Sequence, residues 1–260
     1  MSLTSPPPPG IGLLDLARLR SRTLLFFAAA ALGLLVSGYV VTRSGMPVWG
    51  GTLLFLGAVA VPAGLKWRDD FVAWGPAVMV LSVLLTLQGF HTVEHVVQVA
   101  QFYVLGQPGI RSQGLISSLN IEWVHFTWNW LAAAGVYFVF ARGMRGVWGW
   151  ALLLWVTAHS LEHTLMLARY LSMEQSVMDM TMTSFPVGQA LPGILGRDGW
   201  LATHVPVLRA IPGLASLPRV MIHFNWNVGE MTFLLLAARA GLPRLLSPPL
   251  PFPKDTRPHD

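Results

Sequence analysis

Six long apolar runs constrain the fold of this chain more than any other feature. They lie at about 23–41, 48–65, 73–104, 118–141, 147–171 and 218–240. A bilayer core is crossed by ~20 helical residues, so each run is long enough to span it. Hydrophobic residues make up 53% of the 260 residues and charged residues only 11%. The sequence therefore predicts an all-α integral membrane protein with six transmembrane helices.

Short polar or Gly/Pro-containing segments separate these runs, at 45–47, 66–70, 107–109, 142–145 and 217–218. We expect one membrane domain over 23–241, with one long loop at 172–217. Residues 1–22 and 242–260 would be terminal tails. The first run is interpreted as an uncleaved span, because no small-x-small cleavage site follows it.

The distribution of basic residues predicts the orientation. If the N-terminus is inside, eleven of the 17 Lys and Arg residues lie on the cytoplasmic side and six outside. The positive-inside rule then places both termini in the cytoplasm and the 172–217 loop outside the inner membrane. The chain has no cysteine, which excludes disulfides and thiolate metal sites. It also has no separate basic domain typical of nucleic-acid binding.

Four polar motifs lie inside these apolar runs and form two matched pairs. One pair is His91-Thr-Val-Glu94-His95 and His159-Ser-Leu-Glu162-His163, and the other is His125-Phe-Thr-Trp-Asn129 and His223-Phe-Asn-Trp-Asn227. Each motif of the first pair is followed by one of the second on the next, oppositely directed run. We therefore expect an internally duplicated helical hairpin, with a pseudo-two-fold axis along the membrane normal and a four-helix metal-binding core.

The ionisable side chains of these motifs are expected at one depth of the bilayer. At about 1.5 Å per residue, most of them fall ~8–20 Å below the outer boundary. Each motif also occupies a single face of its helix. Such residues are costly in hydrocarbon without a partner. Imidazoles four residues apart can bind one ion, and a carboxylate can bridge two, so the sequence predicts a dinuclear metal centre in the outer half of the bilayer.

The residue assignments follow from the motifs. The predicted metal ligands are His91, His95, His125, His159, His163, His223, Glu94 and Glu162. The predicted catalytic, proton-handling carboxylates are Glu94, Glu122, Glu162 and Glu230. We expect Asn129, Asn227 and Gln98 to hydrogen-bond around the ligands. A candidate metal-entry route on the long loop is Met178, Met180, Met182 and His204, although Met more often simply fills space in such a loop.

A nitrogen-rich, thiolate-free site suits iron or copper, with zinc or manganese as further options. The ligand chemistry is similar to that of membrane desaturases and hydroxylases, but this chain lacks their His-x-x-His-His pattern. We expect an O2-dependent oxidoreductase of the monooxygenase, hydroxylase or desaturase type, acting on a lipophilic substrate. No flavin or nicotinamide motif is present, so a quinol or an electron-donor protein is an expected partner.

Two other functions remain open at this stage. Histidines on facing helices also ligate haem or chlorophyll in electron-transfer subunits of larger membrane complexes. Small residues at Gly89, 132–135 and Gly229 would leave space for a macrocycle, but the neighbouring carboxylates argue against it. A metal or proton transporter is least favoured, because the cytoplasmic half of the spans offers little polar beyond Ser82, Thr86 and Gln88.

Overall fold

The structure, a computed structural model, is all-helical in the part of the chain that it describes, which confirms the predicted class. It describes residues 12, 13, 16, 22–116, 121–179, 193–197, 199–205, 207, 210, 211 and 215–246, without the side chains of 110 and 173–179. The long helices are α2 (Thr23–Arg43), α3 (Val48–Trp74), α4 (Pro76–Tyr103), α5 (Glu122–Ala141), α6 (Val147–Asp179) and α8 (Arg219–Leu246). Two short helices are η2 (Gly109–Arg111) and α7 (Trp200–His204).

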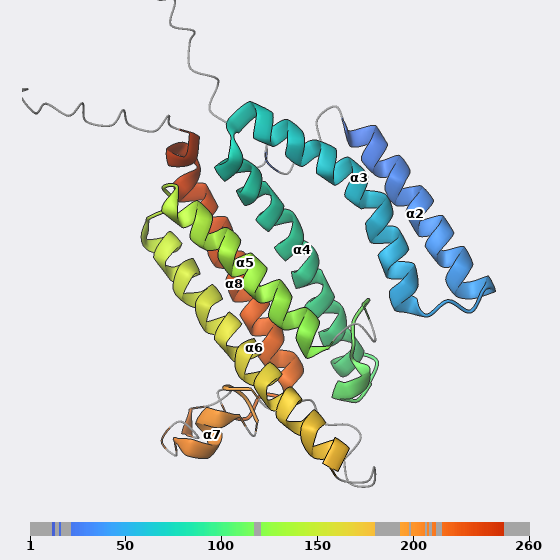
Figure 1. Cartoon of the computed structure of the whole chain (residues 1–260), viewed down its shortest axis with the longest axis vertical. Helices are drawn as coiled ribbons and strands as arrows, with labels where there is room; N and C mark the ends of the chain where they lie inside the picture. The colour runs from blue at the N-terminus through green and yellow to red at the C-terminus, as the bar shows by residue number, and fades with distance from the viewer. Residues whose placement is uncertain are drawn as a thin grey trace, which may run out of the picture.

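Four of the helices form a bundle that holds the polar motifs. Helix α4 packs against α5 and α8, and α6 packs against the same two helices. Figure 1 shows α4, α5, α6 and α8 side by side, while α2 and α3 form a hairpin that leans away from them. This hairpin joins the bundle through contacts between α3 and α4.

Three helices, α2, α3 and α4, are long and apolar enough to cross a membrane. On α2, Leu24 is 82% and Leu35 is 72% exposed, as expected for a surface that faces lipid. Helices α5, α6 and α8 contain 20, 33 and 28 residues, which is long enough for a span. The structure therefore supports a membrane-embedded protein, and the count of six spans stays a prediction.

The predicted interruption at 66–70 is wrong, because α3 continues through these residues. Nζ of Lys66 lies 2.5 Å from Oδ2 of Asp70, one helical turn further along. The same ammonium contacts the hydroxyl of Ser82 on α4. Both charged side chains are buried, at 5% and 1% exposure. A charged segment that resembles a loop in the sequence thus lies in a continuous helix, with its Lys and one Asp paired in the interior.

Other helix ends also differ from the expected limits. Helix α3 ends at Trp74 and is followed by Gly75, whose φ of 84° favours glycine, and Pro76 starts α4 as a first-turn proline. Helix α6 extends to Asp179, into the predicted external loop. Helix α8 continues through Pro243 to Leu246, into the predicted C-terminal tail.

The bundle interior is divided into an apolar half and a polar half. The apolar half is filled by side chains that include Val78, Leu81, Leu84, Ala133, Val136, Val139, Leu152, Val156, Leu234 and Ala238. The buried residues of the other half are mostly His, Glu, Gln and Asn. That half lies toward the end of the bundle where α7 and the α4–α5 connection are found (Figure 1).

Candidate metal centre

All six histidines of the motifs lie inside the bundle, with exposed fractions of 0% to 9%. Their rings form one continuous cluster, in the order His91, His95, His125, His223, His163 and His159. Neighbouring ring centroids in this order are separated by 4.7 Å at the closest, between His91 and His95, and by 6.1 Å at the farthest, between His95 and His125. Helices α4, α5, α6 and α8 thus bring the six predicted histidine ligands together.

Two of these imidazoles have the hydrogen bonding that metal ligands need. Nδ1 of His159 lies 2.8 Å from Oε2 of Glu230, and Nδ1 of His125 lies 3.1 Å from the carbonyl oxygen of Ile121. Because both partners are acceptors, each Nδ1 carries the proton and each Nε2 carries a lone pair. Both Nε2 atoms are buried without a hydrogen-bond partner. Metal-bound histidines are oriented by this kind of second hydrogen bond.

Other ring nitrogens of the cluster are also buried without a partner. They are Nε2 of His91, both nitrogens of His95 and Nδ1 of His163. Oε2 of Glu122 lies 3.8 Å from Nδ1 of His163, which is too far for a hydrogen bond, and this oxygen is unpartnered as well. Buried polar atoms of this kind are costly to leave unsatisfied, so the cluster is chemically incomplete on its own.

The side chains as they stand do not form a closed coordination site. No group of three His, Cys, Asp or Glu side chains within the described ranges is arranged to hold a metal ion. Metal–imidazole bonds are about 2.0–2.1 Å long, so the rings would have to turn toward a common point. The structure thus shows converging, unpaired nitrogen donors without a finished coordination sphere.

Glu94 and Glu162 direct their carboxylates to the loops that follow α4 and α6. The oxygens of Glu94 accept hydrogen bonds from the backbone N–H groups of Leu115, at 2.9 Å, and Ile116, at 3.2 Å. Oε2 of Glu162 accepts one from the N–H of Ile194, at 2.8 Å. We predicted these two carboxylates as metal ligands or bridges; in the structure they bind loop backbone.

Each of these loop segments has a glycine against the carboxylate. A Cβ on Gly114 would lie 1.9 Å from Oε1 of Glu94, and a Cβ on Gly193 would lie 1.9 Å from Oε1 of Glu162. The segments read Gly-Leu-Ile at 114–116 and Gly-Ile-Leu at 193–195. Sequence reasoning missed this pair, although the two similar tripeptides were visible between the matched motifs.

Arg219 is a second residue whose role the sequence did not predict. It belongs to the set of basic residues expected on the outer side of the membrane, yet its guanidinium is buried in the bundle. Nη1 lies 2.5 Å from Oε1 of Glu162, and Nη2 contacts Nε2 of His223 and the sulfur of Met166. The available signal was its position four residues before His223, on the same face of α8. Nε2 of His223 is therefore occupied by this guanidinium.

A chain of hydrogen bonds connects Trp128, which lies against His91, to His159. The indole Nε1 of Trp128 donates to Oε1 of Gln88 at 2.8 Å, and Nε2 of Gln88 donates to Oε1 of Glu230. Oε2 of Glu230 in turn accepts a hydrogen bond from the Nδ1–H group of His159. Gln88 was expected only as a polar residue of the cytoplasmic half, and the structure places it in contact with the site.

The tryptophan of each second-pair motif lies against a histidine of the preceding long helix. The ring centroid of Trp128 is 5.4 Å from that of His91, and that of Trp226 is 5.3 Å from that of His159. The two ring planes are inclined by 38° for Trp128 and His91 and by 6° for Trp226 and His159. The same contact thus occurs once between α4 and α5 and once between α6 and α8.

The predicted supporting amides bind within their own helices. Nδ2 of Asn129 donates to the carbonyl of His125, and Nδ2 of Asn227 donates to that of His223, both at 2.9 Å. Their Oδ1 atoms and Nε2 of Gln98 are buried without partners. These atoms therefore remain available to a bound ligand or to water.

The predicted entry route is only partly covered by the structure. The side chain of Met178, and Met180 and Met182 entirely, lie outside the described residues. His204 ends α7 and is exposed. Its ring stacks on Trp200 with centroids 5.0 Å apart, and it does not belong to the histidine cluster.

Comparison of the chain with protein-family models, with curated proteins and with solved structures finds no match. Function is therefore inferred from the geometry and chemistry of the site itself.

Proposed function

We propose that this chain is a membrane metalloprotein whose metal centre is formed by the histidine cluster, and that it oxidises a lipophilic substrate with O2. The observation that carries the metal site is the hydrogen bonding of His125 and His159. In both rings, Nδ1 donates to an acceptor and Nε2 is buried and free. His91, His95 and His163 supply the further unpaired nitrogens.

Charge balance also supports a bound cation. The carboxylates of Glu94, Glu162 and Glu230 are at most 1% exposed. Within the described residues, Arg219 is the only Lys or Arg ion-paired with any of them. Buried carboxylates without a compensating charge are expensive in a low-dielectric interior. A divalent metal ion among neutral imidazoles would offset that cost.

The unpaired donor set decides which metals fit. It consists of imidazole nitrogens with carboxylates nearby, which suits iron or copper and is compatible with zinc or manganese. When bound, iron or copper would supply the redox chemistry that activates O2. His223 can bind a metal ion through Nε2 only if the guanidinium of Arg219 moves away from that atom. The space for a second ion, as in a dinuclear centre, would therefore depend on the position of that guanidinium.

The reaction that we propose balances with a quinol as the reductant. Hydroxylation would consume one substrate C–H bond, one O2 and one quinol, and would release the alcohol, one water and the quinone. Glu122 is suited to move protons between the site and the outer surface. Its Oε2 has no partner, lies 3.8 Å from Nδ1 of His163, and belongs to a side chain that is 18% exposed.

We further propose that the core is duplicated, with α4–α5 and α6–α8 as the two copies. Three contacts support this proposal because each occurs once per hairpin. A glutamate accepts a hydrogen bond from a loop N–H that follows a glycine, a tryptophan ring lies against a histidine ring, and an asparagine donates to a histidine carbonyl. In this arrangement α5, α6 and α8 cross the bilayer together with α2–α4. Both termini would be cytoplasmic, and the cluster would lie in the outer half of the bilayer.

The geometry favours a metal ion over haem or chlorophyll. Trp155 fills the space at Gly229, where a Cβ would lie 2.3 Å from its ring. Ala133 is fully buried in the packed apolar core. Transport is supported less, because the apolar half of the interior separates the cluster from the buried Lys66–Asp70 pair.

Metal analysis of the purified protein, combined with its optical spectrum and with O2 consumption in the presence of quinol, tests the proposal. We expect one or two iron or copper ions per chain and no Soret band. Folded protein that contains no metal and binds no added iron or copper would overturn the metal centre. A Soret band would establish the haem alternative. A loaded protein that consumes no O2 with any quinol or donor protein would overturn the oxidase function alone.

A further inference from the structure

An apolar cavity of about 290 Å³ opens between α4 and α5, next to the histidine cluster. Its walls are aliphatic except at Gln88 and Trp128. Leu87 and Leu131 border it and are 37% and 67% exposed on the outside of the bundle. On α5 the wall includes Gly135, whose lack of a side chain helps to create the space. Because both helices are proposed spans, this opening would face the lipid chains of the bilayer.

The two polar residues that line this cavity connect it to two imidazoles. The ring of Trp128 lies 5.4 Å from that of His91. Gln88 is bonded to Glu230, which holds Nδ1 of His159. A molecule lying in the cavity would thus have its hydrocarbon part against aliphatic side chains and one end beside groups that touch the cluster. Ligand sites commonly combine an apolar wall with a few polar groups in this way.

We propose that this cavity binds the substrate of the centre, a neutral long-chain molecule with a hydroxyl or carbonyl group at the Gln88 carboxamide, which keeps one N–H and one oxygen lone pair beyond its bonds to Trp128 and Glu230. This inference rests on the proposed function. Charge complementarity selects a neutral ligand, because none of the described residues that line the cavity is charged. A phosphate or carboxylate head group would be left unpaired there. The position of the opening selects a ligand that arrives through the membrane.

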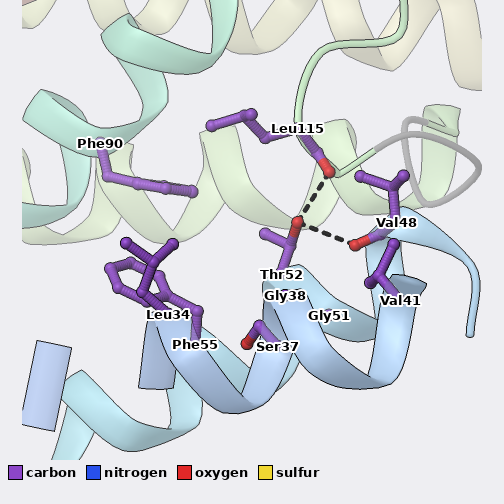
Figure 2. Close-up of a pocket in the computed structure, with 10 residues that line it drawn as sticks. All are labelled: Leu34, Ser37, Gly38, Val41, Val48, Gly51, Thr52, Phe55, Phe90 and Leu115. Carbon is purple, nitrogen blue, oxygen red and sulfur yellow. Dashed lines mark hydrogen bonds between the residues drawn. The ribbon is translucent and has the colours of Figure 1, made fainter. Parts of the chain in front are cut away.

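A second apolar cavity, of about 320 Å³, lies between α2 and α3 and serves as an internal comparison (Figure 2). Phe90 of α4 and Leu115 close one side of it. The hydroxyl of Thr52 points to the carbonyl oxygens of Leu115 and Val48, at 2.9 Å and 3.0 Å. This cavity is as apolar as the first but has no carboxamide and indole at its end.

Photolabelling in lipid nanodiscs tests the assignment. The probe is a long-chain alcohol that carries a diazirine on its chain, and labelled peptides are identified by mass spectrometry. Gly135→Leu adds a side chain at the cavity wall, where a Cβ would already lie 2.9 Å from Cδ2 of Leu84, so the new leucine and the displaced Leu84 would take up cavity space. In the matched control Gly89→Leu, a Cβ on the other cavity-forming helix meets nothing within 4 Å. Ala132→Leu is a second filling variant in case the first does not fold.

We expect labels on α4 and α5 that fall by at least about tenfold in the filling variants, as for a binding loss of that size, and that persist in Gly89→Leu. Equal labelling of the filled and control proteins, or labels concentrated on α2 and α3, would overturn the assignment. Equal labelling of the same peptides by a diazirine phosphatidylcholine would overturn it too, by showing a general lipid site.

The same experiment on His95→Ala separates this inference from the proposed function. Cavity labelling should survive when metal is lost. If no protein preparation binds metal but the labels still disappear on filling, the cavity assignment stands and the metal centre fails. If metal is bound and the cavity is never labelled, the cavity assignment fails alone.

Discussion

Glu230 on α8 holds Nδ1 of His159 on α6 at 2.8 Å, so a carboxylate from one helix fixes an imidazole of another. The second oxygen of this carboxylate is bonded to Gln88 on α4. Since Gln88 also accepts a hydrogen bond from Trp128 on α5, all four bundle helices meet in one hydrogen-bonded unit. A carboxylate that accepts a hydrogen bond from a metal-bound histidine raises the basicity of that histidine and sets its orientation.

Glu230→Gln should consequently weaken metal binding by about 10- to 100-fold, because the amide keeps the shape but loses the negative charge. Metal titration of the purified variant measures the effect. Asp69→Asn is the control, since this partly exposed carboxylate pairs with Arg22, at 3.1 Å, away from the cluster. An unchanged dissociation constant for the metal in Glu230→Gln would show that this carboxylate does not support metal binding.

His95→Ala should remove at least half of the bound metal, because it deletes two unpaired nitrogens from the cluster. Elemental analysis of folded variant protein gives the occupancy. His204→Ala changes an exposed histidine on α7 and should leave the metal content intact. Full occupancy in a folded His95→Ala protein would contradict the ligand assignment.

Arg219→Met should destabilise the protein by about 3–5 kcal/mol, because it leaves the carboxylate of Glu162 buried without its ion-pair partner. The double variant with Glu162→Gln should recover a large part of the loss, since the unpaired charge is then absent. Unfolding in detergent, followed by circular dichroism, provides the comparison. Equal losses in the single and double variants would show that the ion pair is not the cause.

Gly114→Ala and Gly193→Ala should each cost about 1–3 kcal/mol, because the added methyl group displaces a glutamate from the loop N–H groups that it binds. Gly114→Ala should lose more than Gly193→Ala, because Gly114 has a φ of 68°, where any side chain adds backbone strain. Gly38→Ala on α2 is the control, as its Cβ would meet nothing within 4 Å. Thermal unfolding of the three variants measures the difference, and a loss in only one loop would argue against equivalent hairpins.

The helical class and the residues of the cluster could be predicted because both depend on local spacing. His91 and His95 share a helix face whatever the rest of the chain does. The direction of Glu94 could not be predicted in this way, because it depends on where Leu115 and Ile116 pass after the chain turns. The same applies to Arg219, whose partner Glu162 is 57 residues away in sequence.

The interruption expected at 66–70 failed for a related reason. Charges at these positions resemble a solvated loop in a sequence, because the sequence does not show that Lys66 and Ser82 meet across a helix interface. A pairing within one turn, such as Lys66 with Asp70, is visible from spacing. Its burial depends on tertiary packing, which spacing alone does not reveal.

The two glutamates that tie down the outer loops each sit between imidazoles of the same helical turn, Glu94 between His91 and His95 and Glu162 between His159 and His163. Each carboxylate is bonded to the loop that follows its helix. Under the proposed function, a partner that displaced the loop around Leu115 or Ile194 would break these hydrogen bonds and free a carboxylate beside the nitrogen donors.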